Sequence, residues 1–207
     1  QIGIAATMCK WTHRVVDANA ITGDLREAIE QVHHYRPRPV YLELPSDVVR
    51  MPVSDAAPLI ASVQHVVPEL SFAQVASTAK ALAAARFPLI IAGGGSCGAV
   101  VELRVLAELL GAPVGMSENG LGALDARHPL AFTQFGANKL WGKADVVLAL
   151  GTRLYAPVYN WGWDEELHII KVDIDAEELT RLPAPITGVV AEVRQFLQAL
   201  IRELPHH

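Results

Sequence analysis

The most constraining feature of this 207-residue sequence is an alternation of short apolar runs with helical patterns in its C-terminal part. The run Pro88–Ala92 is followed by a glycine-rich turn, a helical pattern over Ala99–Leu110 and a second apolar run at Pro113–Met116. Parallel strands need such a crossover, because a tight turn can only join antiparallel strands. The same alternation predicts three further strands and a last helix, at Val146–Leu150, His168–Val172, Thr187–Val190 and Glu192–Leu204. The sequence therefore predicts an α/β fold with a parallel sheet covered by helices on both faces.

A smaller α/β pattern precedes this part. Apolar residues recur at helical spacing from Thr22 to His34, two prolines end that helix, and a β-prone run follows at Val40–Leu44. Residues 49–70 contain three prolines and no sustained period, which is typical of an interdomain connection. We therefore predict a partial α/β segment over residues 1–48, a linker over 49–70 and the main domain over 71–207.

The main domain is expected to open with a helix that starts at a capping box. Ser71 is followed three residues later by Gln74, so each side chain could satisfy the free backbone N–H of the other residue. This helix is predicted to run to about Arg86.

Composition excludes several classes of function. Seventeen Lys and Arg against 22 Asp and Glu give a net charge of −5, and no basic run could follow a nucleic-acid backbone. The apolar runs are shorter than the roughly 18 to 20 residues that cross a membrane. Cys9 and Cys97 are too few for a disulfide framework and favour a reduced, cytoplasmic setting. We expect Cys97 to be a small buried hydrophobe, although a position near a helix start could lower its pKa.

The strongest candidate for a ligand site is the turn Gly93–Gly98. It fits G-x-G-x-x-G between a strand and a helix, with Glu118 about 20 residues on, as in dinucleotide-binding proteins. Alternatively, Gly93, Gly94 and Gly95 only make a tight turn. A helix terminus contributes about 0.3 to 1 kcal/mol to a nearby anion, whereas micromolar binding needs about 8 kcal/mol. A nucleotide would therefore need most of its binding free energy from residues at the ends of other strands.

Two other strand ends carry suitable side chains. Arg153 could pair with phosphate, and Asp173 could accept a hydrogen bond from ribose or adenine, although both could equally be surface charges. No histidine pair has metal-ligand spacing, and no paired-carboxylate or nucleophile motif is present, so we predict neither a metal site nor a catalytic residue. Trp161 and Trp163 could line a pocket or a subunit contact, but core packing is favoured.

Several segments together resemble the thiamine-diphosphate-dependent enzymes of the acetolactate synthase, oxalyl-CoA decarboxylase and benzoylformate decarboxylase type. In the first part the resemblance is carried by Lys10-Trp11-Thr12 and by the run from Arg36-Pro37 through Leu44-Pro45-Ser46-Asp47-Val48. In the main domain it is carried by a series of short motifs, namely Ala92-Gly93-Gly94-Gly95, Pro113-Val114 with Ser117, Gly120 and Gly122, His128-Pro129-Leu130, Ala144-Asp145, Gly151-Thr152-Arg153 and Val172-Asp173-Ile174-Asp175. Each motif is weak alone, but their order and spacing are specific.

The resemblance implies a fold and a set of partners. Residues 1–48 would end a pyrimidine-binding domain, and 71–207 would form the central domain, a doubly wound parallel sheet of six strands. Some relatives bind ADP or FAD there. The residues that would contact such a nucleotide are Gly93, Gly94, Gly95, Ser117, Arg153, Asp173 and Ile174. FAD is disfavoured because Arg153 is followed by Leu154-Tyr155-Ala156 rather than by the acidic segment of the flavin-binding members. The remaining domains of the parent enzyme and further subunits, as a homodimer or homotetramer, are the implied partners.

The resemblance also implies that key parts of the enzyme lie outside this sequence. The family's catalytic glutamate would lie before Gln1, and its diphosphate and Mg²⁺ motif would lie beyond His207. Gly23-Asp24 is followed by Leu25 inside a predicted helix and does not supply that motif. We therefore expect a fragment of a decarboxylase or carboligase that uses thiamine diphosphate and Mg²⁺ and is inactive alone. A self-sufficient NAD-binding module and a pure oligomerisation domain are the alternatives.

Overall fold

The computed structural model describes residues 1–54 and 67–207, and the chain divides into two compact units, Gln1–Val67 and Pro68–His207. The division falls within the stretch 49–70 that the sequence predicts to be a linker. Part of this predicted linker lies outside the described residues. Val48–Arg50 forms a short 3₁₀ turn at its start.

The second unit contains a parallel sheet of six strands in the order β5-β4-β3-β6-β7-β8. The strands, from one edge of the sheet to the other, are β5 Ala131–Thr133, β4 Val114–Met116, β3 Pro88–Ala92, β6 Val146–Leu150, β7 His168–Asp173 and β8 Ile186–Val190. All five neighbouring pairs are parallel. The prediction of a six-stranded, doubly wound sheet is therefore confirmed.

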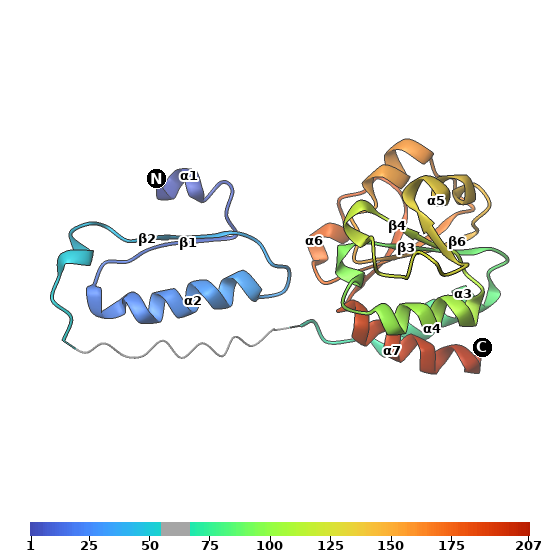
Figure 1. Cartoon of the computed structure of the whole chain (residues 1–207), viewed down its shortest axis with the longest axis horizontal. Helices are drawn as coiled ribbons and strands as arrows, with labels where there is room; N and C mark the ends of the chain where they lie inside the picture. Colours follow the sequence, from blue (N-terminus) through green and yellow to red (C-terminus); the bar gives the residue numbers. More distant parts are fainter. Residues whose placement is uncertain (55–66) are drawn as a thin grey trace. The chain divides into compact units, whose positions relative to one another are not determined.

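Helices cover both faces of this sheet (Figure 1). One face packs against α3 Phe72–Ala84, α4 Val100–Leu110 and α7 Val193–Glu203. The other face packs against α5 Gln134–Trp141 and the π-helical turn Pro157–Trp161. Trp163, shortly after this turn, is 41% exposed, so the expectation that it packs in the core is wrong. A fifth, short helix, α6 Ala176–Leu179, follows β7. Because side chains alternate along a strand, successive residues of β3 and β6 enter opposite cores, and both strands are apolar throughout.

In the second unit the expected elements were found with small shifts at their ends, but β5, α5 and the short α6 were missed. β5 has only three residues and no alternating pattern of its own, so nothing in its sequence marks a strand. It forms because it pairs with β4, from Val114↔Ala131 to Met116↔Thr133. α5 begins directly afterwards, with the Thr133 side chain accepting a hydrogen bond from the Gly136 N–H at 3.4 Å.

The capping box predicted at α3 is only half formed. The Ser71 hydroxyl accepts from the Gln74 N–H at 3.4 Å, as expected. The Gln74 side chain, however, donates to the Gly188 carbonyl of β8 at 3.0 Å instead of reaching back to the Ser71 N–H. Packing of α3 beside the edge strand brought this carbonyl within reach, which the local sequence could not reveal.

The first unit is a single β-α-β unit. β1 Trp11–Arg14 pairs in parallel with β2 Val40–Glu43, and α2 Ile21–His33 connects them. A short helix, α1 Ile2–Ala5, lies on the other side of the strand pair from α2 (Figure 1). Lys10 ends the turn before β1 and donates its ammonium to carbonyls at the C-terminus of α2, including that of Gln31 at 3.0 Å. This contact satisfies carbonyl groups that the last turn of a helix leaves without partners.

Candidate functional site

The candidate site is the edge of the six-stranded sheet where the strands end. Strands β3, β4 and β5 follow one another from the middle of the sheet to one edge. Strands β6, β7 and β8 follow one another from the other side of β3 to the opposite edge. The connections after β3 and β6 therefore leave in opposite directions, and doubly wound proteins bind ligands at such a switch point. The seven predicted binding residues all lie at carboxyl ends of strands, after β3, after β4, after β6 and at the end of β7.

Glycines at the switch point allow two loops to touch through their backbones. A Cβ on Gly93 would lie 2.2 Å from the Gly151 carbonyl oxygen, and one on Gly95 would lie 2.9 Å from the Gly151 Cα. The Gly95 N–H donates to the Gly151 carbonyl at 3.1 Å, and the Gly93 N–H donates to the Leu150 carbonyl at 2.9 Å. These donors are thus already bound within the protein. Close packing of the loops accounts for Gly93 and Gly95 without a ligand.

The loop after β4 is packed against the end of β3 in the same way. The Ser117 N–H donates to the Ala92 carbonyl at 3.0 Å, and Ser117 is half-buried. A Cβ on Gly120 would lie 2.2 Å from the same carbonyl oxygen, and one on Gly94 would lie 3.2 Å from the Asn119 carbonyl oxygen. Glu118, which the dinucleotide fingerprint places on a ribose, has an exposed side chain at this edge.

Cys97, at the end of the glycine turn, contradicts the expectation that it is buried. Its side chain is exposed, with the thiol 3.6 Å from the Asn119 carbonyl oxygen. Burial was expected because no histidine neighbours Cys97 in the sequence and a free cysteine usually packs as a small hydrophobe. The short 3₁₀ helix Gly94–Ser96 instead buries Ser96, whose hydroxyl donates to the Leu150 carbonyl at 2.8 Å.

Arg153 lies between two buried residues in the loop after β6. Thr152 and Leu154 are buried, whereas the Arg153 side chain is exposed at the carboxyl edge. Leu154 has a left-handed backbone with a φ of +58°, and its N–H donates to the Thr152 hydroxyl at 3.2 Å. A buried leucine in this conformation costs about 1 kcal/mol or more, and such strain clusters at binding and catalytic sites.

Asp173 and Ile174 form the turn at the end of β7. The Asp173 side chain is buried, and one of its oxygens accepts from the Asp175 N–H at 3.0 Å. The Asp175 side chain in turn accepts from the Glu177 N–H at 3.1 Å and caps α6. Ile174 is half-buried between them. Asp173 thus stabilises the turn Asp173-Ile174-Asp175, called the D-I-D turn below, and Asp175 caps the N-terminus of the next helix.

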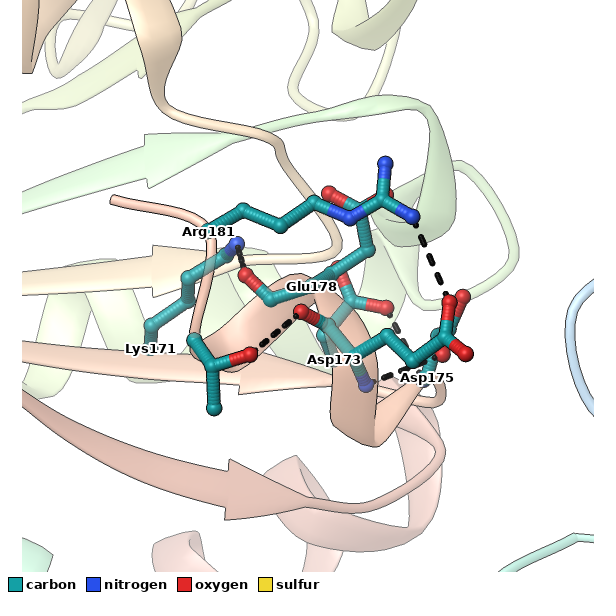
Figure 2. Close-up of polar contacts among 7 residues, drawn as sticks. Lys171, Asp173, Asp175, Glu178 and Arg181 are labelled. Atoms are coloured by element: carbon teal, nitrogen blue, oxygen red, sulfur yellow. Dashed lines mark hydrogen bonds and ion pairs between the residues drawn. The ribbon is translucent and has the colours of Figure 1, made fainter.

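A buried lysine beside this turn was missed by sequence reasoning. Lys171 is fully buried in β7 and donates its ammonium to the Glu178 carbonyl (Figure 2). Its neighbours on the adjacent strands are the small residues Ala149 and Gly188, which leave room for the side chain. A charged residue inside the apolar run that forms β7 was the available signal, because lysine is almost never fully buried without a partner.

Arg181 completes the polar network around α6. Its guanidinium lies 3.4 Å from the buried Glu178 carboxylate and 3.3 Å from the exposed Glu177 carboxylate (Figure 2). A hydrogen bond with the Tyr155 hydroxyl, together with the Glu178 charge, raises the pKa of Arg181. The network therefore joins the turn after β7 to the segment after β6.

The described residues contain no side-chain cluster that fits the Mg²⁺ ion of a thiamine diphosphate site. No cluster of three His, Cys, Asp or Glu side chains among them could hold a metal ion. The Gly23-Asp24 pair lies inside α2, and the Asp24 carboxylate is 3.2 Å from the His13 ring. No helix within residues 1–54 and 67–207 is long and apolar enough to cross a membrane.

The chain matches the family described as thiamine pyrophosphate enzyme, central domain, over residues 75–200. Its second unit therefore defines it as a member of the thiamine-diphosphate-dependent enzymes. A protein named as a probable 2-ketoarginine decarboxylase from Pseudomonas aeruginosa is 34% identical over 82% of this chain and 31% of its own length. The mitochondrial acetolactate synthase of Schizosaccharomyces pombe is 30% identical over 96% of this chain and 34% of its own length.

The fold comparison points the same way. The crystal structure of benzoylformate decarboxylase from Polynucleobacter necessarius superimposes with a TM-score of 0.78 at 18% identity, covering 94% of this chain and 38% of that one. The chain spans about a third of the length of the curated relatives it matches. These findings favour the thiamine-enzyme interpretation over a self-sufficient NAD-binding module.

Proposed function

We propose that this chain supplies the central scaffold domain, and an adjoining part of the pyrimidine-binding domain, of a thiamine-diphosphate-dependent decarboxylase or carboligase. The family match over residues 75–200 is the observation that carries this proposal. The named relatives include a decarboxylase of 2-oxo acids and an acetolactate synthase, so a 2-oxo acid is the proposed substrate class. Thiamine diphosphate, when bound, supplies an electron sink for cleavage beside a carbonyl group.

In this proposal the chain positions the catalytic domains and performs no chemical step itself. The described residues lack a side-chain cluster that could hold a metal ion, and Asp24 is paired with His13. The diphosphate and Mg²⁺ are therefore proposed to be held by other parts of the parent enzyme. We also propose that the parent works as a homodimer or homotetramer.

The first unit supports the proposed joining role. Its two strands are only half-buried, and both have an unpaired edge within the described residues. Isolated two-stranded sheets are marginal in water. We propose that further strands of a pyrimidine-binding domain complete this sheet in the parent enzyme.

The activity test compares two polypeptides. The 207-residue chain, given thiamine diphosphate, Mg²⁺ and pyruvate, should release no CO₂ above the rate of buffer. The polypeptide encoded by the complete reading frame should release CO₂ or form a carbon–carbon bond with a 2-oxo acid. Turnover by the 207-residue chain alone, or a complete frame without thiamine-dependent activity, would overturn the proposal.

We further propose that a nucleotide at the carboxyl edge, if the parent carries one, is ADP rather than FAD. The support is chemical: Arg153 is exposed for phosphate, and Asp173 and Ile174 lie at the end of β7. Since the N–H groups of Gly93 and Gly95 are bound within the protein, most of the affinity must come from Arg153, Ser117 and the D-I-D turn.

Calorimetric titration of the chain with ADP, FAD and NAD tests this second proposal. Binding of ADP, weakened at least about tenfold by Arg153→Ala, is the expected result. Exposed Arg104→Ala on α4 is the matched control and should leave ADP binding unchanged. Tight NAD binding without a response to ADP would instead favour a dinucleotide-binding module.

A further inference from the structure

A buried carboxylate oxygen in the first unit has no hydrogen-bond partner among the described residues. It is Oε2 of Glu43, the last residue of β2. The Glu43 side chain is only 19% exposed, and its other oxygen, Oε1, lies 3.9 Å from the Arg14 guanidinium, too far for a hydrogen bond. Native proteins pair nearly all shielded polar atoms. Oε2 therefore indicates a donor that lies outside the described residues.

Glu43 lies on the face of the strand pair opposite α2. Register partners on neighbouring strands share a face, and successive residues of one strand alternate between faces. His13 faces α2, because its ring is 3.2 Å from the Asp24 carboxylate of that helix, and its register partner is Leu42. The next pair, Arg14 and Glu43, therefore points to the side of the strand pair on which α1 lies (Figure 1).

This second face is covered far less than the face that packs against α2. We call the side of the strand pair that carries Tyr41 and Glu43 the α1 face. α1 has four residues, against 13 in α2, and its N-cap residue Gln1 accepts a hydrogen bond from the Tyr41 hydroxyl at 3.3 Å. Ile4 and Met8 are 69% and 71% exposed. Since parallel sheets are normally covered by helices on both faces, the α1 face is incomplete.

We propose that the α1 face binds a neighbouring segment of the parent enzyme's pyrimidine-binding domain, and that this segment places a neutral hydrogen-bond donor on Oε2 of Glu43. An amide or hydroxyl donor is favoured over a cation, because the Arg14 guanidinium already offsets the single carboxylate charge. The same polypeptide can supply the segment, since this chain spans about a third of the length of its curated relatives. The inference rests on the proposed function only in that the parent continues this domain.

The test compares one substitution in two polypeptides, the 207-residue chain and the product of the complete reading frame. Glu43→Met replaces the carboxylate by an apolar group of similar length. Hydrogen exchange of the β1 amides, none of which the substitution alters, reports the stability of the first unit in both polypeptides.

The expected effect changes sign between the two polypeptides. In the 207-residue chain, Glu43→Met should slow exchange at least about threefold, because it removes a carboxylate oxygen that is shielded from water without a donor. The contact with exposed Arg14 that is lost at the same time contributes little. In the complete polypeptide, Glu43→Met should speed exchange at least about tenfold, because the incoming donor is left without an acceptor.

Two further variants separate the hydrogen bond from the charge and from the loss of any surface carboxylate. Glu43→Gln keeps a carbonyl acceptor for a neutral donor, so it should speed exchange in the complete polypeptide less than about threefold. Glu27→Met is the control, because Glu27 is exposed on α2 and methionine is as good a helix former as glutamate. It should change exchange less than about twofold in both polypeptides.

Three results would overturn the inference. If Glu43→Met does not slow exchange in the 207-residue chain, that chain already satisfies Oε2 by itself. If Glu43→Met slows exchange in both polypeptides, the parent brings no donor to this oxygen. If Glu43→Gln costs the complete polypeptide as much as Glu43→Met, the donor is a cation. Release of CO₂ from a 2-oxo acid by the unaltered complete polypeptide tests the proposed function separately, so the two failures are distinguishable.

Discussion

The two units of this chain are both built from parallel strands and connecting helices, yet they bury these elements to very different degrees. All five residues of β6 in the second unit are buried, whereas none of the residues of β1 and β2 in the first unit is fully buried. Helix α7 buries four apolar side chains, and α2 buries only Ala28. The same β-α-β pattern therefore gives a closed core only where helices cover both faces of a wide sheet.

The difference also explains the size of the two cores. Among the described residues, the core of the first unit consists of Val15, Ala18 and Val48, with Ile21 and Leu42 packed against it. The second unit has two extended cores, one on each side of its sheet. Stability scales with the apolar area removed from water. We therefore expect the second unit to tolerate heat and denaturant that unfold the first.

The largest expected effect compares one leucine from each unit. Leu148→Ala removes a fully buried side chain from β6 and should lower the free energy of unfolding of the second unit by about 3 to 5 kcal/mol. Leu42→Ala, in half-buried β2, should cost less than about 1.5 kcal/mol. Hydrogen exchange of the β6 and β2 amides in denaturant measures both values. Equal losses would mean that the first unit has a tighter core than its burial indicates.

The next largest effect on stability is expected at Gly93, at the carboxyl edge of the six-stranded sheet. Gly93→Ala would place a Cβ 2.2 Å from the Gly151 carbonyl oxygen and 2.6 Å from the Thr152 Cβ. Both atoms are part of the packed loops, so we expect a loss of about 3 kcal/mol in the second unit. Gly98→Ala is the control, since the nearest described atom to its new Cβ would be the end of the Arg194 side chain at 3.9 Å. If the two variants unfold at the same denaturant concentration, the close contact of the loops is not rigid.

The strands of the second unit could be predicted from the sequence more completely than the contacts at the carboxyl edge of its sheet. Apolar runs gave β3 and β6 with the bounds that the structure shows, because a fully buried strand must be apolar along its whole length. The glycine turn was found, but its motif could not show that the N–H groups of Gly93 and Gly95 are bound by β6 and the residue after it. Those partners lie far away in the sequence, and only the strand order brings them together.

The polar network around α6 shows a second limit. Asp173 was chosen for its place at a strand end, whereas Lys171, Glu178 and Arg181 were passed over. Their roles depend on the small neighbours Ala149 and Gly188 and on the path of the chain after α6. A charge inside an apolar run is visible in the sequence, but its partner is not.

A carboxylate at the opposite edge of the sheet gives a smaller and pH-dependent effect. Asp145 accepts from the N–H groups of Arg86 and Phe87 at 2.7 and 2.9 Å and ties the entry of β3 to that of β6. Burial alone would raise the pKa of Asp145, but these hydrogen bonds outweigh it and hold the pKa below its usual value. Asp145→Asn should cost the second unit about 1 to 2 kcal/mol at pH 7.

The pH dependence of this effect follows from the sign of the shift. A depressed pKa in the folded state stabilises the protein above the unfolded value of about 3.9, and the contribution is lost as the pH falls further. The difference between wild type and Asp145→Asn should therefore shrink below about pH 4. Asp47→Asn in the first unit is the comparison, because its side chain makes no capping hydrogen bond. A constant difference between pH 7 and pH 3 would contradict the assignment to the carboxylate charge.

The smallest effect has the opposite sign and belongs to the first unit. Gly23 lies inside α2, and no atom of residues 1–54 or 67–207 lies within 4 Å of the Cβ that alanine would add there. Gly23→Ala should stabilise the first unit by about 0.5 to 1 kcal/mol, because alanine loses less backbone entropy in a helix. Hydrogen exchange of the α2 amides measures this gain, and the β6 amides should not change. A loss of stability would mean that this face of α2 is covered in solution. The side chains of the first unit would then be more buried, and closer to those of the second unit, than the structure shows.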